Sequence, residues 1–137
     1  MEVLTTVVIL SVLMMMGLPQ YRKVIERGYW DSAGDVLLAI YAGEQTYLTV
    51  NGTYKGGLGP GSTMADWREI YVDKPASAGE PVEYSVTAAG PPPTFIAQAK
   101  RICGTCTYNN QVLRIDQDKN VGCPGCVVGV DVQWLRP

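Results

Sequence analysis

Four cysteines arranged as two CxxC pairs are the residues with the most evident chemistry. The pairs Cys103-Gly-Thr-Cys106 and Cys123-Pro-Gly-Cys126 are separated by 16 residues. This spacing fits a structural zinc site with four cysteine ligands, which is a strong pattern in a cytosolic protein. In an exported protein, four cysteines more often form two disulfides. Neither pair lies in a thioredoxin-like βαβ setting, which disfavours catalytic redox use, and no histidine follows either pair to complete a c-type haem site.

The remaining composition excludes most familiar catalytic designs. The chain contains no histidine, so a Ser-His-Asp triad, a Cys-His pair and histidine-ligated metals are all excluded. The net charge of −2, from 11 basic and 13 acidic residues, argues against a dedicated nucleic-acid binder. We therefore expect no enzymatic activity, no catalytic residues and no specific nucleic-acid partner.

One acidic cluster is similar to the start of a calcium-binding loop. Asp116, Asp118 and Asn120 have the alternating spacing of such a loop. However, Val121 stands where glycine is needed and Val127 where a bidentate glutamate is needed. A polar hairpin turn is the better interpretation of these residues.

The elements that position these residues begin with an apolar run. Residues 3–18 carry no charge, and 12 of these 16 residues are apolar. As a helix, this segment would be apolar on every face. Such a helix satisfies its own backbone in lipid, and the hydroxyls of Thr5, Thr6 and Ser11 can bond back to carbonyls one turn earlier. At about 1.5 Å per residue the run covers roughly 24 Å, slightly less than a hydrocarbon core. We predict an apolar helix over residues 1–21 that inserts in a membrane.

The helix continues, and a second part of different character follows. Residues 22–50 are amphipathic, with one apolar stripe made of Ile25, Ala33, Val36, Leu37, Ile40, Tyr47 and Leu48. Asn51-Gly52 is a natural helix end. Residues 51–82 are rich in glycine and proline, and we predict a connecting loop with one short element around Trp67–Val72.

The C-terminal residues 83–137 show strand patterns. We expect four strands separated by turns at Pro91-Pro92-Pro93 and Asn109-Asn110: Glu83–Ala89, Thr94–Ile102, Gln111–Asp116 and Val127–Trp134. The predicted fold is therefore α+β. A long N-terminal helix packs its amphipathic half on a small antiparallel sheet, and the globular head covers residues 22–137.

The N-terminal residues resemble a known family. Glu2, the apolar run and Gly17-Leu18-Pro19-Gln20-Tyr21 are similar to the N-terminal segment of bacterial type IV pilins and pseudopilins, including the 17 positions from Glu2 to Pro19. The segments GEQTYLTVNGTY at 43–54, TFIAQAKR at 94–101 and VLRIDQDKN at 112–120 also look like this family. The resemblance covers the first 54 residues firmly and the sheet loosely. Since several residues normally precede this glutamate in pilins, we expect the mature protein to have a few residues before Met1.

The resemblance implies a structural function. It implies that Glu2 neutralises the α-amino group of an adjacent subunit, and that the helix loses helicity near Gly17 and Pro19 on assembly. An unpaired charge in an apolar bundle is costly, so such an acid aligns the subunits. Arg22, Lys23 and Arg27 follow the span, and the charges of a removed leader would set its orientation.

We therefore expect a subunit of an extracellular type IV pilus-like filament, for adhesion, surface motility or DNA uptake. The implied partners are identical subunits, a prepilin peptidase and the pilus assembly machinery of the inner membrane, through which the chain reaches the pilus. The alternatives are a pseudopilin of a type II secretion system and a membrane-anchored domain in which the four cysteines serve a zinc or redox role.

Export favours oxidised cysteines over structural zinc, and no other cofactor is expected. If a hairpin is centred between residues 114 and 115, Cys103 faces Cys126 and Cys106 faces Cys123 across it. We therefore predict these two disulfides, with a zinc site formed by the same four cysteines as the alternative.

Overall fold

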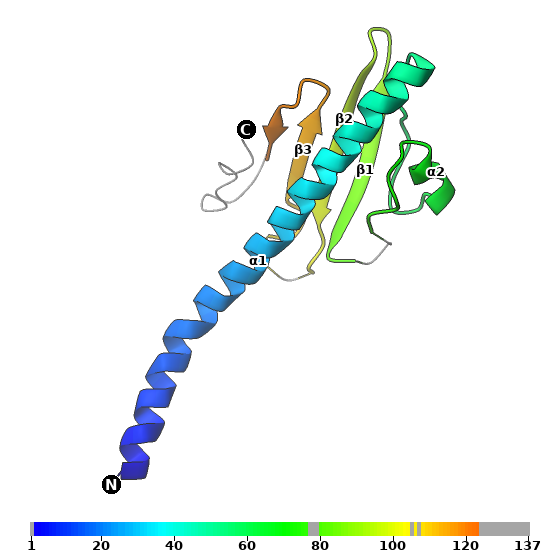
Figure 1. Cartoon of the computed structure of the whole chain (residues 1–137). Helices are drawn as coiled ribbons and strands as arrows, with labels where there is room; N and C mark the ends of the chain where they lie inside the picture. Colours follow the sequence, from blue (N-terminus) through cyan, green and yellow to red (C-terminus); the bar gives the residue numbers. More distant parts are fainter. Residues whose placement is uncertain (1, 77–79, 105, 107, 124–137) are drawn as a thin grey trace. The chain divides into compact units, whose positions relative to one another are not determined.

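The computed structural model shows a long helix followed by a small sheet (Figure 1). It describes residues 2–76, 80–104, 106 and 108–123, without the side chains of residues 2 and 16–19. In chain order the elements are α1 Glu2–Asn51, α2 Met64–Arg68, β1 Val82–Ala89, β2 Thr94–Arg101, β3 Val112–Asp116 and β4 Val121–Gly122. This arrangement confirms the predicted α+β class.

The chain forms two compact units, Met1–Asp31 and Ser32–Pro137, and α1 contributes residues to both. The start of the head at residue 22 stays a prediction. The side chains of residues 20–25 are exposed. Ile25, which we placed on the apolar stripe, is 40% exposed. The buried positions of α1 begin at Trp30 and continue with Ala33, Leu37 and Ile40.

The helix ends where the sequence predicts. The amide of Gly52 donates to the Leu48 carbonyl at 2.8 Å, and Gly52 has a φ of +74°. Glycine often ends a helix in this left-handed conformation, because it has no Cβ that would clash there. The Asn51 side chain donates to the Tyr47 carbonyl at 3.1 Å and so satisfies another carbonyl of the last turn.

The four strands form one antiparallel sheet in the order β1-β2-β3-β4. The first three predicted strands are confirmed, each to within one residue at either end. The turns at Pro91-Pro92-Pro93 and at Asn109-Asn110 separate them as expected, and Asn110 has a φ of +63°. The fourth predicted strand, Val127–Trp134, lies outside the described residues.

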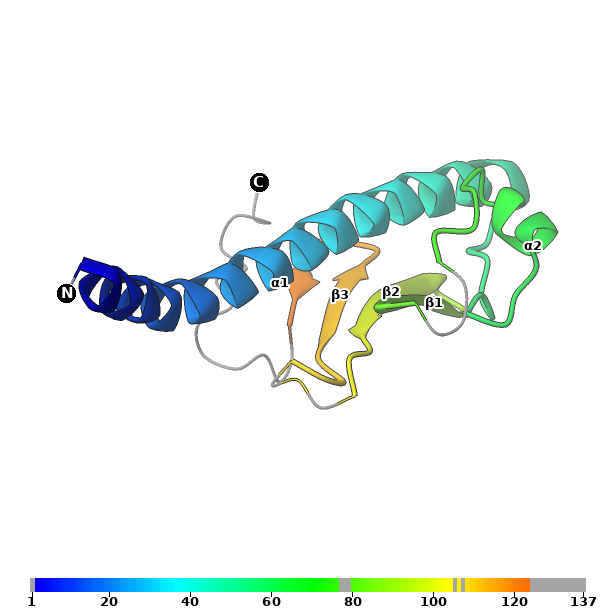
Figure 2. The ribbon, with the colours of Figure 1, turned by 90° about the horizontal axis from the view of Figure 1, so that it is seen from below.

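Small side chains in the central strand shape the inner face of the sheet. Ala99 of β2 is paired with Tyr84 of β1 and with Leu113 of β3, and all three are buried. The next inward row repeats the pattern with Ala97 between Val86 and Ile115. The small alanines of β2, between larger residues of β1 and β3, leave room for a helix over β2. The part of α1 from Ser32 lies across this face (Figure 2).

An aromatic cluster joins the helix, the connecting loop and the sheet. The ring of Phe95 in β2 lies 6.1 Å from the ring of Tyr41 on α1 and 4.7 Å from that of Tyr54 in the loop, centroid to centroid. Both arrangements are tilted, as aromatic pairs prefer. The Tyr54 hydroxyl also accepts a hydrogen bond from Gln45 of α1 at 3.2 Å. The C-terminal part of α1 therefore contacts the sheet through Tyr41 and the loop through Gln45.

The connecting loop carries the short helix α2, slightly earlier than the predicted element at Trp67–Val72. Thr63 caps its N-terminus: its hydroxyl accepts from the amide of Asp66, whose carboxylate accepts from the amide of Thr63. This reciprocal pattern fixes the start of a helix. Trp67 of α2 is 1% exposed, so α2 supplies a large side chain to the core.

Candidate functional site: an exposed apolar helix segment

The first part of α1 presents apolar side chains outward on every face. The described side chains from Val3 to Met15 are all exposed, with Val3 at 75% and Met15 at 81%. Burying such side chains stabilises a protein by about 1.5–3 kcal/mol each. A soluble monomer rarely exposes a contiguous apolar surface of this kind, so such a surface marks a site of association with lipid or protein.

Two hydroxyl groups of this segment are satisfied within the helix. The Thr6 hydroxyl donates to the Val3 carbonyl at 2.8 Å, and the Ser11 hydroxyl donates to the Val7 carbonyl at 2.7 Å. These bonds confirm the predicted back-bonding of Thr6 and Ser11. The segment can therefore enter an apolar environment without leaving these hydroxyls unpaired.

Its length and composition suit a membrane. Among the residues that the structure describes, α1 is the one helix long and apolar enough to cross a bilayer. The apolar stretch near the N-terminus could serve as an anchor or as a signal sequence, because both have this composition.

The three predicted assembly residues lie along this helix, far from the sheet in sequence. Glu2 is the first residue of α1, and the helix is continuous through Gly17 and Pro19. At about 1.5 Å per residue, Glu2 and Pro19 are roughly 26 Å apart along the axis. The structure therefore does not bring Glu2 and Pro19 together. The side chains of all three residues lie outside the described part.

The structure corrects the predicted disulfide pairing. Cys103 is bonded to Cys106 within the same CxxC, with a Cα–Cα distance of 5.6 Å. A cysteine forms one disulfide, so the predicted Cys103–Cys126 and Cys106–Cys123 bridges are not formed. Cys123 is also disulfide-bonded, and Cys126 lies outside the described residues.

The register of the last hairpin explains this error. Arg114 pairs with Gly122 and Ile115 with Val121, so the hairpin is centred on residue 118 and not between residues 114 and 115. The hairpin centre on which the predicted cross-pairing depended is therefore not the observed one. Cys103 and Cys106 instead lie in the β2–β3 connection, where the Asn109 side chain accepts from the Cys103 amide at 3.1 Å and donates to the Gly104 carbonyl at 2.9 Å.

The zinc alternative does not fit this oxidised form. Zinc binds thiolates, and the sulfurs of Cys103 and Cys106 are bonded to each other. No group of three or more histidine, cysteine, aspartate or glutamate residues that could hold a metal occurs within the described ranges. Cys126 would complete the predicted set, and it lies outside these ranges.

The acidic cluster after β3 forms the predicted hairpin turn. One carboxylate oxygen of Asp116 accepts from the amides of Asp118 at 3.0 Å and Asn120 at 2.9 Å, and the other accepts from the Asn120 side chain. Slight burial raises the pKa of Asp116, but these hydrogen bonds outweigh it and hold the pKa below its usual range. The carboxylate closes the turn between β3 and β4.

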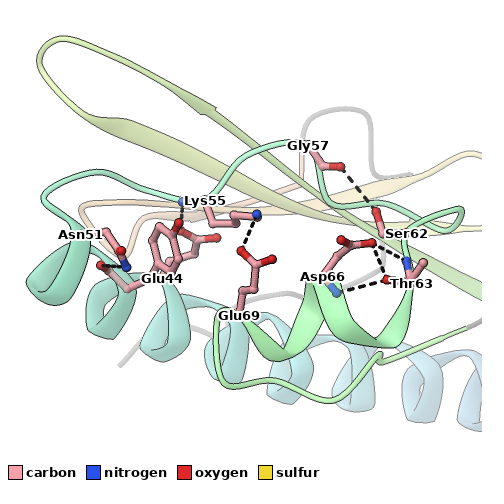
Figure 3. Close-up of polar contacts among 9 residues, drawn as sticks. Glu44, Asn51, Lys55, Gly57, Ser62, Thr63, Asp66 and Glu69 are labelled. Atoms are coloured by element: carbon pink, nitrogen blue, oxygen red, sulfur yellow. Dashed lines mark hydrogen bonds and ion pairs between the residues drawn. The ribbon is translucent and has the colours of Figure 1, made fainter.

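One functional candidate was missed by sequence reasoning: Glu44, which is 0% exposed on the buried face of α1. Its Oε2 accepts a hydrogen bond from the Lys55 backbone amide at 2.8 Å (Figure 3). Burial raises the pKa of Glu44 to about 7, although the Lys55 amide and the Lys55 charge both lower it. The available signal was an acid on the helix face shared by Ile40 and Tyr47.

A buried cation at the end of β2 was also missed. Arg101 is 5% exposed, and its guanidinium donates to the carbonyls of Pro81 at 2.8 Å and Ile102 at 3.1 Å. These bonds tie the start of β1 to the end of β2, beside the Cys103–Cys106 loop. Arg101 therefore positions the end of β2, which the cysteines follow in the chain.

Comparisons of the chain with protein-family models, with curated proteins and with solved structures found no match.

Proposed function

We propose that this chain is the structural subunit of an extracellular filament of the type IV pilus kind, which polymerises through the first part of α1. The observation that carries the proposal is the exposed apolar surface from Val3 to Met15 on a helix that also contributes to the packed head. Because the surface is apolar on all faces, it suits a bundle in which each helix is surrounded by others.

The position of the acid supports the same function. Glu2 begins the helix at the end of the apolar surface. A single carboxylate there is costly in an apolar bundle unless it is paired with a cation, so it selects one axial register between subunits. Before assembly the same helix inserts in the inner membrane, and a plain membrane anchor would have no use for the acid.

The head has the properties required of a filament's outer layer. Its core is built by α1 from Ser32, by α2 and by the four-stranded sheet, and the Cys103–Cys106 disulfide closes one of its loops. A disulfide suits an oxidising compartment outside the cytoplasm. The proposal therefore places the head in the extracellular space and the apolar segment in the filament core.

Cryo-electron microscopy of filaments sheared from cells that express the chain would test this proposal. We expect a helical map whose core is made of parallel helices and whose outer layer fits residues 32–123. Recovery of the chain only as a monomer in the membrane fraction, with no filaments, would contradict the proposal.

A further inference from the structure

Glu44 lies where α1, the connecting loop and α2 meet. Its carboxyl group accepts the amide hydrogen of Lys55 with Oε2, while Oε1 is buried and has no hydrogen-bond partner among the described residues. A carboxylate has about four acceptor sites, and a buried carboxylate needs several donors to replace water. One backbone amide is too little to stabilise a full negative charge at this position.

The charged groups around Glu44 do not supply the missing compensation. The Lys55 ammonium, whose charge acts on Glu44, lies 2.6 Å from the Glu69 carboxylate that follows α2 (Figure 3). Asp66 of α2 and Tyr47 of α1 also interact electrostatically with Lys55. The positive charge of Lys55 is therefore shared with acids nearer to solvent.

Neighbouring backbone seals this junction. A Cβ at Gly43 would overlap the Ile70 carbonyl oxygen, which shows how closely the residues after α2 approach α1. Leu58, Trp67 and Ile70 are also buried, at 4%, 1% and 0% exposure. In this arrangement Glu44 is 0% exposed, and residues 52–72 supply its hydrogen-bond donor, the Lys55 amide.

We propose that residues 52–72 dock on α1 with uptake of one proton by Glu44, so that docking weakens as the pH rises to neutrality. In the docked state the carboxyl group is neutral and still accepts the Lys55 amide. Opening returns Glu44 to water, where it releases the proton to solvent. The raised pKa of about 7 agrees with this direction: a group that binds protons more tightly in the docked state favours that state at low pH.

Amide hydrogen exchange on the full-length protein in detergent micelles tests this coupling. With a pKa of 4.5 in the open state and about 7 in the docked state, the opening equilibrium should rise about thirtyfold between pH 5.5 and pH 8.5, after correction for intrinsic exchange. The reporters are the amides of Lys55, Ile70 and Val72, which are hydrogen-bonded in the docked segment. The amide of Ala97 in β2 is the internal reference.

Two variants separate Glu44 from other titrating groups. Glu44→Gln keeps the size and an acceptor for the Lys55 amide but cannot ionise, so its opening should not change with pH. Glu69→Gln removes a neighbouring acid and should keep the full pH dependence. An unchanged pH dependence in Glu44→Gln, or an equal rise at Ala97, would overturn the proposal.

A direct titration covers the case in which Glu44→Gln does not fold. The side-chain carboxyl carbon of Glu44 in the wild-type protein can be followed by carbon-13 NMR. A midpoint near neutrality supports the proposal, and a midpoint at the ordinary glutamate value would overturn it.

Discussion

Gly43 of α1 packs against the Ile70 carbonyl oxygen so closely that no Cβ fits between them. The side chain of Val72 would also meet an added Cβ, at 3.1 Å. The closest contact is between backbone atoms of Gly43 and Ile70. Rotation of a side chain therefore cannot make room for an added Cβ. The glycine that weakens the helix in the sequence is therefore what allows the loop to approach.

We predict that Gly43→Ala destabilises the protein although alanine is the better helix former. Overpacking a buried contact costs about 1–3 kcal/mol, which exceeds the roughly 1 kcal/mol gained in helix propensity. Thermal unfolding followed by near-ultraviolet circular dichroism measures the effect. Gly28→Ala is the matched control, because beyond its own turn of helix no described atom lies within 4 Å of the added Cβ, and it should not lower the stability.

Glu2→Ala should greatly reduce filament assembly and leave the head folded. The carboxylate begins the apolar segment, in the unit Met1–Asp31, whereas the sheet belongs to the other unit. Filament counts in shear fractions by electron microscopy give the result. Asp35→Ala, which removes an exposed acid from the same helix, should assemble normally. Normal filaments in Glu2→Ala would remove the role assigned to Glu2.

A fragment that starts at Arg27 should be a soluble monomer. It omits the exposed apolar segment but keeps Trp30 and the buried positions that follow. Light scattering after gel filtration should give the monomer mass, and circular dichroism should show both helix and sheet. Filaments formed by this fragment would show that polymerisation depends on the head.

Tryptic digestion without reduction should release the peptide Ile102–Arg114 with an internal disulfide. Cleavage after Arg101 and Arg114 separates Cys103 and Cys106 from the second CxxC, so this peptide is released alone unless a disulfide links it to the second CxxC. Its mass should be two hydrogens below that of the reduced peptide. A peptide linked to the fragment with Cys123 would instead support the cross-pairing.

The same disulfide should contribute little to stability. A bond between residues three apart closes a very short loop, for which the chain-entropy estimate is about 2 kcal/mol. The double variant Cys103→Ser/Cys106→Ser should therefore still fold, with a lower denaturant midpoint. The free energy of unfolding from urea titration checks this. A loss much larger than the estimate would mean that the bond has a further structural role in the β2–β3 connection.

The sequence by itself predicted the long helix, the first three strands and their order. The apolar character of residues 3–18 has no period, so the sequence predicted a helix with apolar surroundings on all sides. The alternation in β1, β2 and β3 and the turn residues between them predicted these strands because each pattern is local. The hairpin at Asp116 followed in the same way from a carboxylate next to backbone donors.

The tertiary structure alone decided which distant residues meet. The β3–β4 register places the centre of the last hairpin at residue 118, and Cys103 is bonded to Cys106 of its own CxxC. The buried state of Glu44 depends on a loop that is brought back from eleven residues later in the chain. Register and loop docking depend on the packing of whole faces, and such packing leaves no local pattern in the sequence.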